Sequence, residues 1–148
     1  MPSTRSKGAG AASCASRTPL LLGAIVVLAL AARLFYILAV RNVSSPPEYD
    51  GITYDMIARS LLAGKGFGTE APTAFRPPVY PLFVALIYAV GGHSIAVLRI
   101  VQAVLGAVTT VVTYRVAMLI FSRPRLSLLA AALVALHPVL IYLNRITI

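Results

Sequence analysis

The stretch LLLGAIVVLALAARLFYILAV, from Leu20 to Val40, decides the fold, because it is 21 residues long and Arg33 is its only charged residue. A helix of about 20 apolar residues spans the roughly 30 Å hydrocarbon core of a bilayer. The apolar part of a cleaved signal peptide is shorter, at about 7–15 residues. The stretch therefore predicts a transmembrane helix that is not cleaved.

Further apolar runs follow this first one. The run from Ile95 to Phe121 is long enough to span a membrane, and the run from Leu126 to Leu143 is broken only by His137 and Pro138. A shorter segment, Pro77 to Gly92, offers about a dozen helical residues, which favours an interfacial or re-entrant helix over a span. The predicted fold class is an all-α polytopic membrane protein with three transmembrane helices and an external loop that carries interfacial juxtamembrane helices.

The composition supports a membrane protein. Of the 148 residues, 59% are hydrophobic and 11% are charged, and the mean hydropathy is +0.87. Soluble domains have about 25% charged residues, so an ordinary cytosolic enzyme is excluded. The net charge of +9 is spread over the tail, the loops and the segment ends, whereas nucleic-acid readers carry a clustered basic face. The single cysteine, Cys14, excludes an internal disulfide and a cysteine-based zinc site.

The placement of the basic residues predicts the orientation. Residues 1–18 are rich in Ser, Ala and Gly and carry basic residues but no acid, so they are predicted to form a disordered basic tail. Arg123 and Arg125 follow the second span. The positive-inside rule places the tail and this link in the cytoplasm. We expect a multi-pass protein of the inner (plasma) membrane, with its transmembrane part at 19–148 and its external loop at about 41–94.

The external loop holds every acid of the chain, and it is the part in which we expect chemistry. The acids are Glu48, Asp50, Asp55 and Glu70. Behind Pro46 and Pro47, apolar residues recur at helical spacing until Gly64, which predicts an amphipathic helix on the membrane surface. These apolar residues are Tyr54, Ile57, Ala58, Leu61 and Leu62.

Several short motifs stand in a recognisable order. They are D-G-I-T-Y at 50–54, A-R-S-L-L-A-G-K-G-F at 58–67, R-P-P-V-Y-P-L-F at 76–83, R-I-V-Q-A-V-L-G-A at 99–107 and H-P at 137–138. In this order, the chain from Leu20 to Ile148 resembles the GT-C glycosyltransferases. It is most similar to the branch with the protein O-mannosyltransferases, the lipid A aminoarabinose transferase and bacterial relatives that act on cell-envelope glycans. Those enzymes take sugar from a polyprenyl-phosphate donor.

The resemblance implies a catalytic role for Asp50, since that family places an acid in the first external loop just before a surface helix. A sugar hydroxyl or amine that attacks an anomeric carbon must lose a proton. A carboxylate can take that proton, or it can hold a divalent metal that assists. Asp50 also suits a helix cap ahead of Gly51, where Asp is favoured by about 0.5–2 kcal/mol. The two roles are compatible.

The resemblance also implies substrate-binding residues. It places a phosphate-contacting basic residue at Arg76, and it makes Tyr54 and Arg99 further candidates. A guanidinium suits a polyprenyl phosphate because it presents several donors to the phosphate oxygens and stays charged. The alternative role for Arg76 is an interfacial anchor against lipid headgroups.

Some positions depart from the family pattern. Many relatives read D-E-x-R-Y, and here Gly51 and Thr53 replace the second acid and the arginine. Asp55 is the alternative that could substitute for the missing acid, but it is expected to face water, because on a helix it points about 100° away from Tyr54. Arg33 is expected either to reach the membrane interface or to face a polar interior, since a charge in lipid is costly.

The function that the resemblance implies is a hexosyl- or pentosyltransferase, of which this chain forms the N-terminal part. Its partners would be membrane lipid and a polyprenyl-phosphate sugar donor, with a cell-envelope glycan, lipid or protein as acceptor and no nucleic acid. The alternative is a small non-catalytic membrane assembly protein or a transporter fragment. In that case the acidic loop would be a solvated connector.

Overall fold

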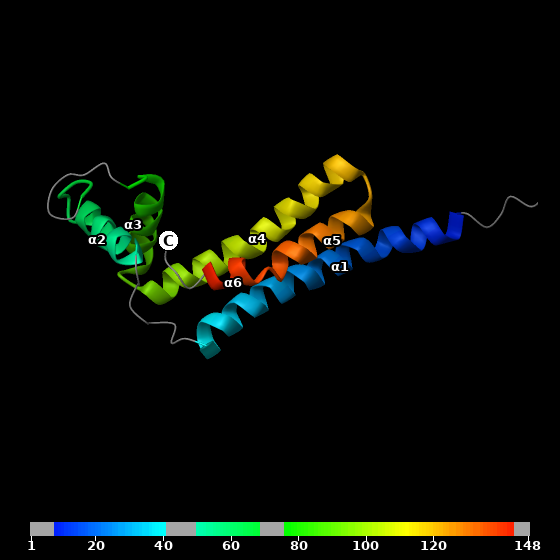
Figure 1. The fold of residues 1–148 in the computed structure, drawn as a ribbon, viewed down its shortest axis with the longest axis horizontal. Helices are drawn as coiled ribbons and strands as arrows, with labels where there is room; N and C mark the ends of the chain where they lie inside the picture. Colours follow the sequence, from blue (N-terminus) through cyan, green and yellow to red (C-terminus); the bar gives the residue numbers. More distant parts are fainter. Residues whose placement is uncertain (1–7, 41–49, 69–75, 144–148) are drawn as a thin grey trace, which may run out of the picture.

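The computed structural model describes residues 8–40, 50–68 and 76–143. In chain order its helices are α1 (Gly8–Phe35), the π-helix η1 (Tyr36–Val40), α2 (Asp50–Leu62), α3 (Val79–Gly91), α4 (Ile95–Phe121), α5 (Pro124–Ala135) and α6 (Pro138–Leu143). Figure 1 shows that the described residues form helices joined by turns, which confirms the all-α prediction.

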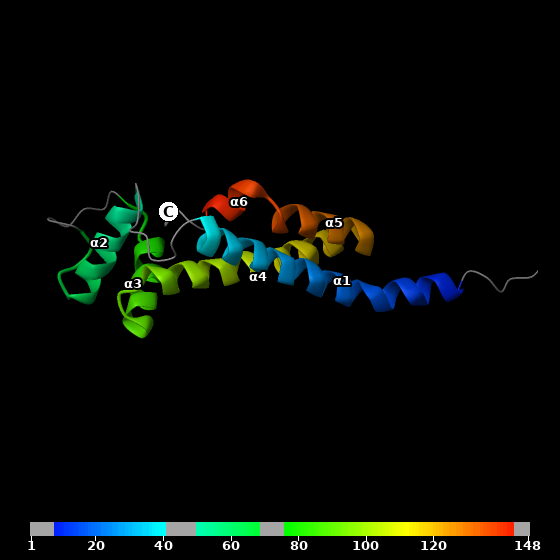
Figure 2. The same ribbon diagram turned by 90° about the horizontal axis from the view of Figure 1, so that it is seen from below.

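Helices α1, α4 and α5 pack side by side, with α4 antiparallel to the other two (Figures 1 and 2). Small side chains lie in the contacts between them, so that the backbones approach closely, as in membrane helix bundles. Among the described residues of these helices, the buried small ones are Ala29, Ala103, Ala107, Thr110, Ala117, Ser127, Ala131 and Ala135. Large apolar side chains such as Val27, Val112 and Leu133 are more than half exposed. This distribution suits helices whose outer faces contact lipid.

Within the part of the chain that the structure describes, two helical segments are long and apolar enough to cross a membrane. They are Arg17–Ala39, which includes most of α1, and the whole of α4. The third predicted span, Leu126 to Leu143, is divided between α5 and α6. The division has a physical cause, because Pro138 has no N–H with which to continue the hydrogen-bond ladder of α5. The structure therefore shows two of the three predicted spans as single long helices.

Helices α2 and α3 form a pair at one end of the bundle, beside the start of α4 (Figure 1). Together with Leu98 of α4 they form a core, whose members from α2 and α3 are Ala58, Val84, Ala85 and Tyr88. Helix α3 has 13 residues, so it is about 20 Å long and too short to cross the hydrocarbon core. Gly64 and Gly66, with φ of 69° and 90°, turn the chain after α2. The two predicted short helices of the external loop are thus observed.

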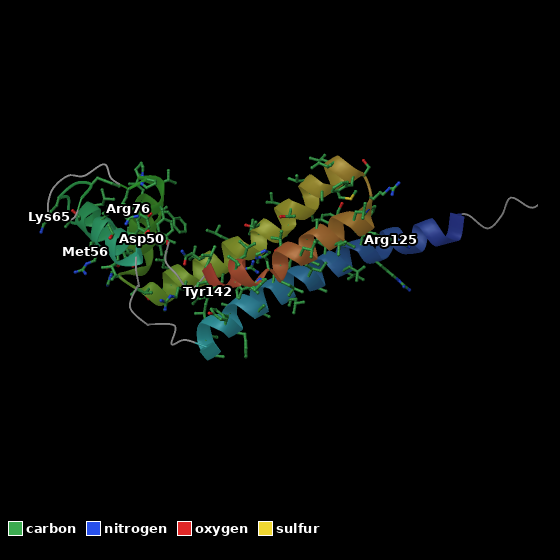
Figure 3. All side chains as sticks on the ribbon, in the orientation of Figure 1. Asp50, Met56, Lys65, Arg76, Arg125 and Tyr142 are labelled. Carbon is green, nitrogen blue, oxygen red and sulfur yellow. The ribbon has the colours of Figure 1, made fainter. Side chains whose placement is uncertain are left out.

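The opposite end of the bundle carries the basic link between α4 and α5. Figure 3 labels Arg125 at this end and Asp50 and Arg76 at the other. Helix α1 begins here at Gly8, inside the segment 1–18 for which the sequence predicts disorder. The alanines of this segment favour a helix. Residues 1–7 of the predicted tail lie outside the described residues.

Candidate functional site

An ion pair joins α2 to the start of α3. The Nη2 group of Arg76 donates a hydrogen bond of 2.6 Å to Oδ1 of Asp50, and the two side chains are 25% and 52% exposed. The Arg76 guanidinium lies 5.6 Å from the centre of the Tyr54 ring, a cation–π distance. The structure therefore brings together three of the residues that the sequence predicts for the site. We call Asp50 and Arg76 the Asp50–Arg76 pair.

Local structure positions both members of the Asp50–Arg76 pair. Asp50 is the first residue of α2, where the positive end of the helix dipole favours a carboxylate. Arg76 precedes Pro77 and Pro78, whose fixed φ angles restrict the backbone that leads into α3. The hydrogen bond to Asp50 raises the pKa of the Arg76 guanidinium above its ordinary value. The site thus presents a cation and a carboxylate at the end of the bundle.

A series of contacts leads from this pair to α4. The ring of Tyr54 meets the ring of Tyr80 edge to face, with 4.9 Å between their centres. The Nε2 group of Gln102 donates a hydrogen bond of 2.8 Å to the Tyr80 hydroxyl. Neither Tyr80 nor Gln102 is predicted as a site residue. The signal available for Tyr80 is its place in the motif at 76–83, and for Gln102 it is an amide within an apolar helix.

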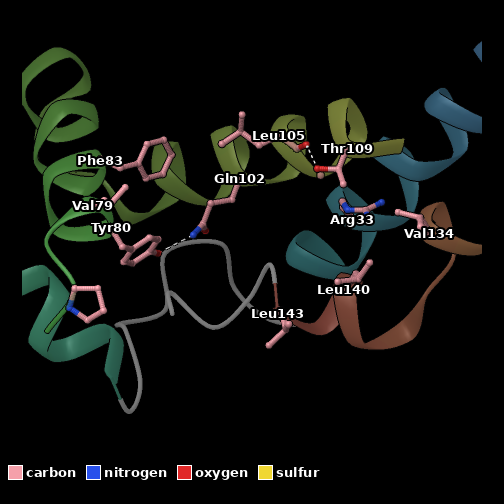
Figure 4. Close-up of a pocket in the computed structure, with 12 residues that line it drawn as sticks. Arg33, Val79, Tyr80, Phe83, Gln102, Leu105, Thr109, Val134, Leu140 and Leu143 are labelled. Atoms are coloured by element: carbon pink, nitrogen blue, oxygen red, sulfur yellow. Dashed lines mark hydrogen bonds between the residues drawn. The ribbon is translucent and has the colours of Figure 1, made fainter. Parts of the chain in front are cut away.

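An apolar groove of about 600 Å³ runs along α4, and neither Asp50 nor Arg76 is among the residues that line it. Pro77, the residue after Arg76 in the chain, lines one end of it, and Arg33 of α1 lines another part. Its walls come from α3, α4 and α6, as Figure 4 shows. They include Tyr80, Phe83, Gln102, Leu105, Leu140 and Leu143. The groove therefore offers a long apolar molecule a place next to the Asp50–Arg76 pair.

Arg99, the fourth predicted site residue, is buried one helical turn after the start of α4. Only 3% of its surface is exposed, and it adjoins the buried Leu98 in the chain. A buried arginine is well placed to position neighbouring groups but presents little surface to a ligand. Its substrate-binding role stays a prediction.

Asp55 does not face water, and that expectation is wrong. Its side chain is 13% exposed, because this side of α2 packs against α3 and the turn that follows α3. The Tyr88 hydroxyl donates a hydrogen bond of 2.7 Å to its Oδ1 atom, and Nε2 of His93 lies 2.9 Å from the same oxygen. Burial and the bond to Asp55 both raise the pKa of Tyr88. Asp55 therefore holds α2 against α3.

The next question is whether the described residues near Asp50 supply enough ligands to bind a divalent metal ion. Among the residues that the structure describes, no three His, Cys, Asp or Glu side chains lie close enough to hold a metal ion. Mg²⁺ is commonly bound by one or two carboxylates together with waters and substrate phosphate oxygens, so a single carboxylate would need the donor phosphate to complete such a site. Both roles of Asp50, as a proton acceptor and as the holder of a metal that assists, stay predictions.

The tyrosine contacts predict a loss of stability at alkaline pH. Burial raises the pKa of the Tyr80 phenol to about 12, against the opposing effect of the hydrogen bond from Gln102. In the unfolded chain the same phenol ionises near about pH 10. The unfolded state therefore loses this proton first, so stability falls as the pH rises from about 10 to about 12. Between about pH 10 and pH 12, the midpoint temperature of thermal unfolding in detergent should fall less steeply for Tyr80→Phe than for the parent. Equal slopes of this temperature against pH would contradict the expectation.

The fold and the site define the chain as a helical membrane protein with a charged pair and an apolar groove at one end. Residues 75–148, half of the chain, match the model of the dolichyl-phosphate-mannose-protein mannosyltransferase family. The chain belongs to this family, and membership indicates a glycosyltransferase of the GT-C type. The match includes Arg76 and Arg99, whereas Asp50 and Tyr54 precede it.

No curated protein and no solved structure matches the chain. The family match and the two long apolar helices together indicate membrane association.

Proposed function

We propose that residues 19–148 form the N-terminal transmembrane part of a GT-C glycosyltransferase that transfers a sugar from a polyprenyl-phosphate donor to a cell-envelope acceptor. The observation that carries this proposal is the Asp50–Arg76 pair beside the apolar groove. Such a donor combines a phosphate with a long apolar chain. The site offers a guanidinium for the phosphate and a groove for the chain.

In this proposal Asp50 is the general base. The acceptor hydroxyl gives its proton to the Asp50 carboxylate as its oxygen bonds to the anomeric carbon. The bond from that carbon to the donor oxygen breaks, and the polyprenyl phosphate leaves with the electron pair. A carboxylate within hydrogen-bond reach of the hydroxyl is sufficient for this step. The direct test is sugar transfer by an Asp50→Asn variant.

Arg76 holds the donor phosphate in this proposal. Its guanidinium has five N–H donors, so it can bind phosphate oxygens while it keeps the bond to Asp50. The Tyr54 ring, 5.6 Å from the guanidinium carbon, helps to keep the cation in place. Arg99 would support the donor site from α4. The donor phosphate would therefore lie close to the base that activates the acceptor.

We also propose that the chain crosses the membrane three times, with its N-terminus in the cytoplasm of a cell with an inner (plasma) membrane. Helices α5 and α6 together occupy residues 124–143, about 30 Å of helix, and return the chain toward the end that carries α2 and α3. The basic link at 122–125 lies at the other end, which favours a cytoplasmic position for it. Helices α2 and α3 then lie outside.

Cysteine labelling tests this arrangement. In a Cys14→Ser background, a membrane-impermeant reagent applied from outside should modify Lys65→Cys and Gly91→Cys, which lie on either side of α3, but not Ser122→Cys. All three positions are exposed in the structure. Labelling of Ser122→Cys from outside, or of only one of the two positions that flank α3, would contradict the topology. Permeabilised membranes, in which all three react, serve as the control.

A further inference from the structure

Arg33 lies in the membrane-spanning part of α1 and is 2% exposed. Its Nη1 group donates a hydrogen bond of 2.9 Å to the Ala29 carbonyl of its own helix and one of 3.1 Å to the Ala135 carbonyl of α5. Figure 4 shows the side chain lying between α4 and Val134 of α5. Of the two expectations for Arg33, the one in which it reaches the membrane interface is wrong. The side chain turns into the bundle.

The partner in α5 explains why a cation is tolerated there. Ala135 is the last residue of α5, and the last carbonyls of a helix have no N–H partner one turn ahead. These carbonyls also form the negative end of the helix dipole. The break before Pro138 therefore leaves the Ala135 carbonyl as an acceptor inside the bundle, and Arg33 donates to it.

The facing helix α4 leaves room for this side chain. A Cβ atom at Gly106 would lie 2.5 Å from Nε and 3.1 Å from Cδ of Arg33. Those distances are far below van der Waals contact, so any larger residue at 106 would displace the guanidinium. Three helices thus contribute to one arrangement: the arginine from α1, the carbonyl from α5 and the glycine from α4.

We propose that Arg33 is a positioning residue that fixes the break between α5 and α6 and so sets the direction of α6. Leu140 and Leu143 of α6 form one wall of the groove, and the bond to Ala135 holds the end of α5 from which α6 departs. Tyr142 of α6 also meets Tyr36, the first residue of η1, with 6.5 Å between the ring centres. The proposal concerns the geometry of the groove and does not depend on sugar transfer.

Distances between spin labels in nanodiscs test the proposal on the whole chain, in a Cys14→Ser background. One pair, at Val108 and Val139, joins α4 to α6, and a second pair, at Val27 and Val112, joins α1 to α4. All four positions are exposed.

In the parent, each pair should give a distance distribution with a single narrow peak. In Arg33→Met, the α4–α6 pair should lose its narrow peak while the α1–α4 pair keeps it. Arg33→Lys, which retains a cation with N–H donors, should restore the peak.

A second variant leaves Arg33 in place. Gly106→Ala should broaden the α4–α6 distance in the same way, because the new Cβ displaces the guanidinium. Gly23→Ala is the matched control, since a Cβ at that position in α1 has no neighbour within 4 Å, and it should change neither pair. A narrow α4–α6 distance in Arg33→Met would overturn the proposal. Equal broadening of both pairs would also overturn it, because Arg33 would then hold the bundle as a whole.

Discussion

Asp50→Asn is expected to reduce sugar transfer by about 10²–10⁴-fold, the usual contribution of a positioned general base. Asparagine keeps the size of aspartate, a carbonyl oxygen that can accept the hydrogen bond from Arg76, and a strong preference for helix N-termini. It cannot accept a proton from the acceptor. The variant should therefore fold and still lose activity. The measurement is transfer of labelled sugar from a polyprenyl-phosphate donor in membranes that carry the enzyme.

Asp55→Asn is the matched control for this variant. It makes the same chemical change on the same helix, at an acid that binds Tyr88 and His93 rather than Arg76. It should lower stability and leave the rate per folded molecule close to the parental rate. If Asp50→Asn transferred sugar at the parental rate, the general-base role would be contradicted. Asp50 would then serve only at the start of its helix.

Much of the fold is predictable from the sequence because apolar length is a strong signal. The run from Ile95 to Phe121 is observed as α4 with the same ends, since Ser94 and Ser122 stop the helix on both sides. The short helix after Pro77 is also observed, because its prolines and Gly92 limit its length. The third span differs: Pro138 interrupts a run whose composition alone predicts one helix.

The side-chain contacts are less predictable, because they depend on which helices meet. The sequence of α2 alone predicts that Asp55 faces water. Only the packing of α3 against α2 gives Asp55 its partner Tyr88. Arg33 donates to the Ala135 carbonyl, 102 residues away in the chain, and that carbonyl lacks an intrahelical partner because α5 ends there. Motif order places Asp50 and Arg76 in the same site, but their direct bond requires that α2 and α3 pack side by side.

Arg76→Gln is expected to weaken the binding of polyprenyl phosphate by about tenfold to a hundredfold. Loss of a charged hydrogen bond costs about 1.5–3 kcal/mol, and each 1.4 kcal/mol is about a factor of ten in affinity. Glutamine retains a polar side chain with N–H donors, although it is shorter than arginine, so the variant removes the charge and keeps a donor. Arg59→Gln is the matched control, because Arg59 is an exposed arginine of α2 whose carboxylate contact is with Asp55 at 3.8 Å. It should leave the affinity unchanged.

In the proposed function, the Asp50–Arg76 pair and the groove together receive a lipid with a phosphate head. The most direct test measures the dissociation constants of polyprenyl phosphate and of neutral polyprenol for the parent and Arg76→Gln in nanodiscs. The parent should prefer the phosphate, and the variant should lose most of that preference while it binds polyprenol as before. Equal losses for the two lipids would contradict the claim, because Arg76 would then anchor the protein in the membrane rather than bind the phosphate.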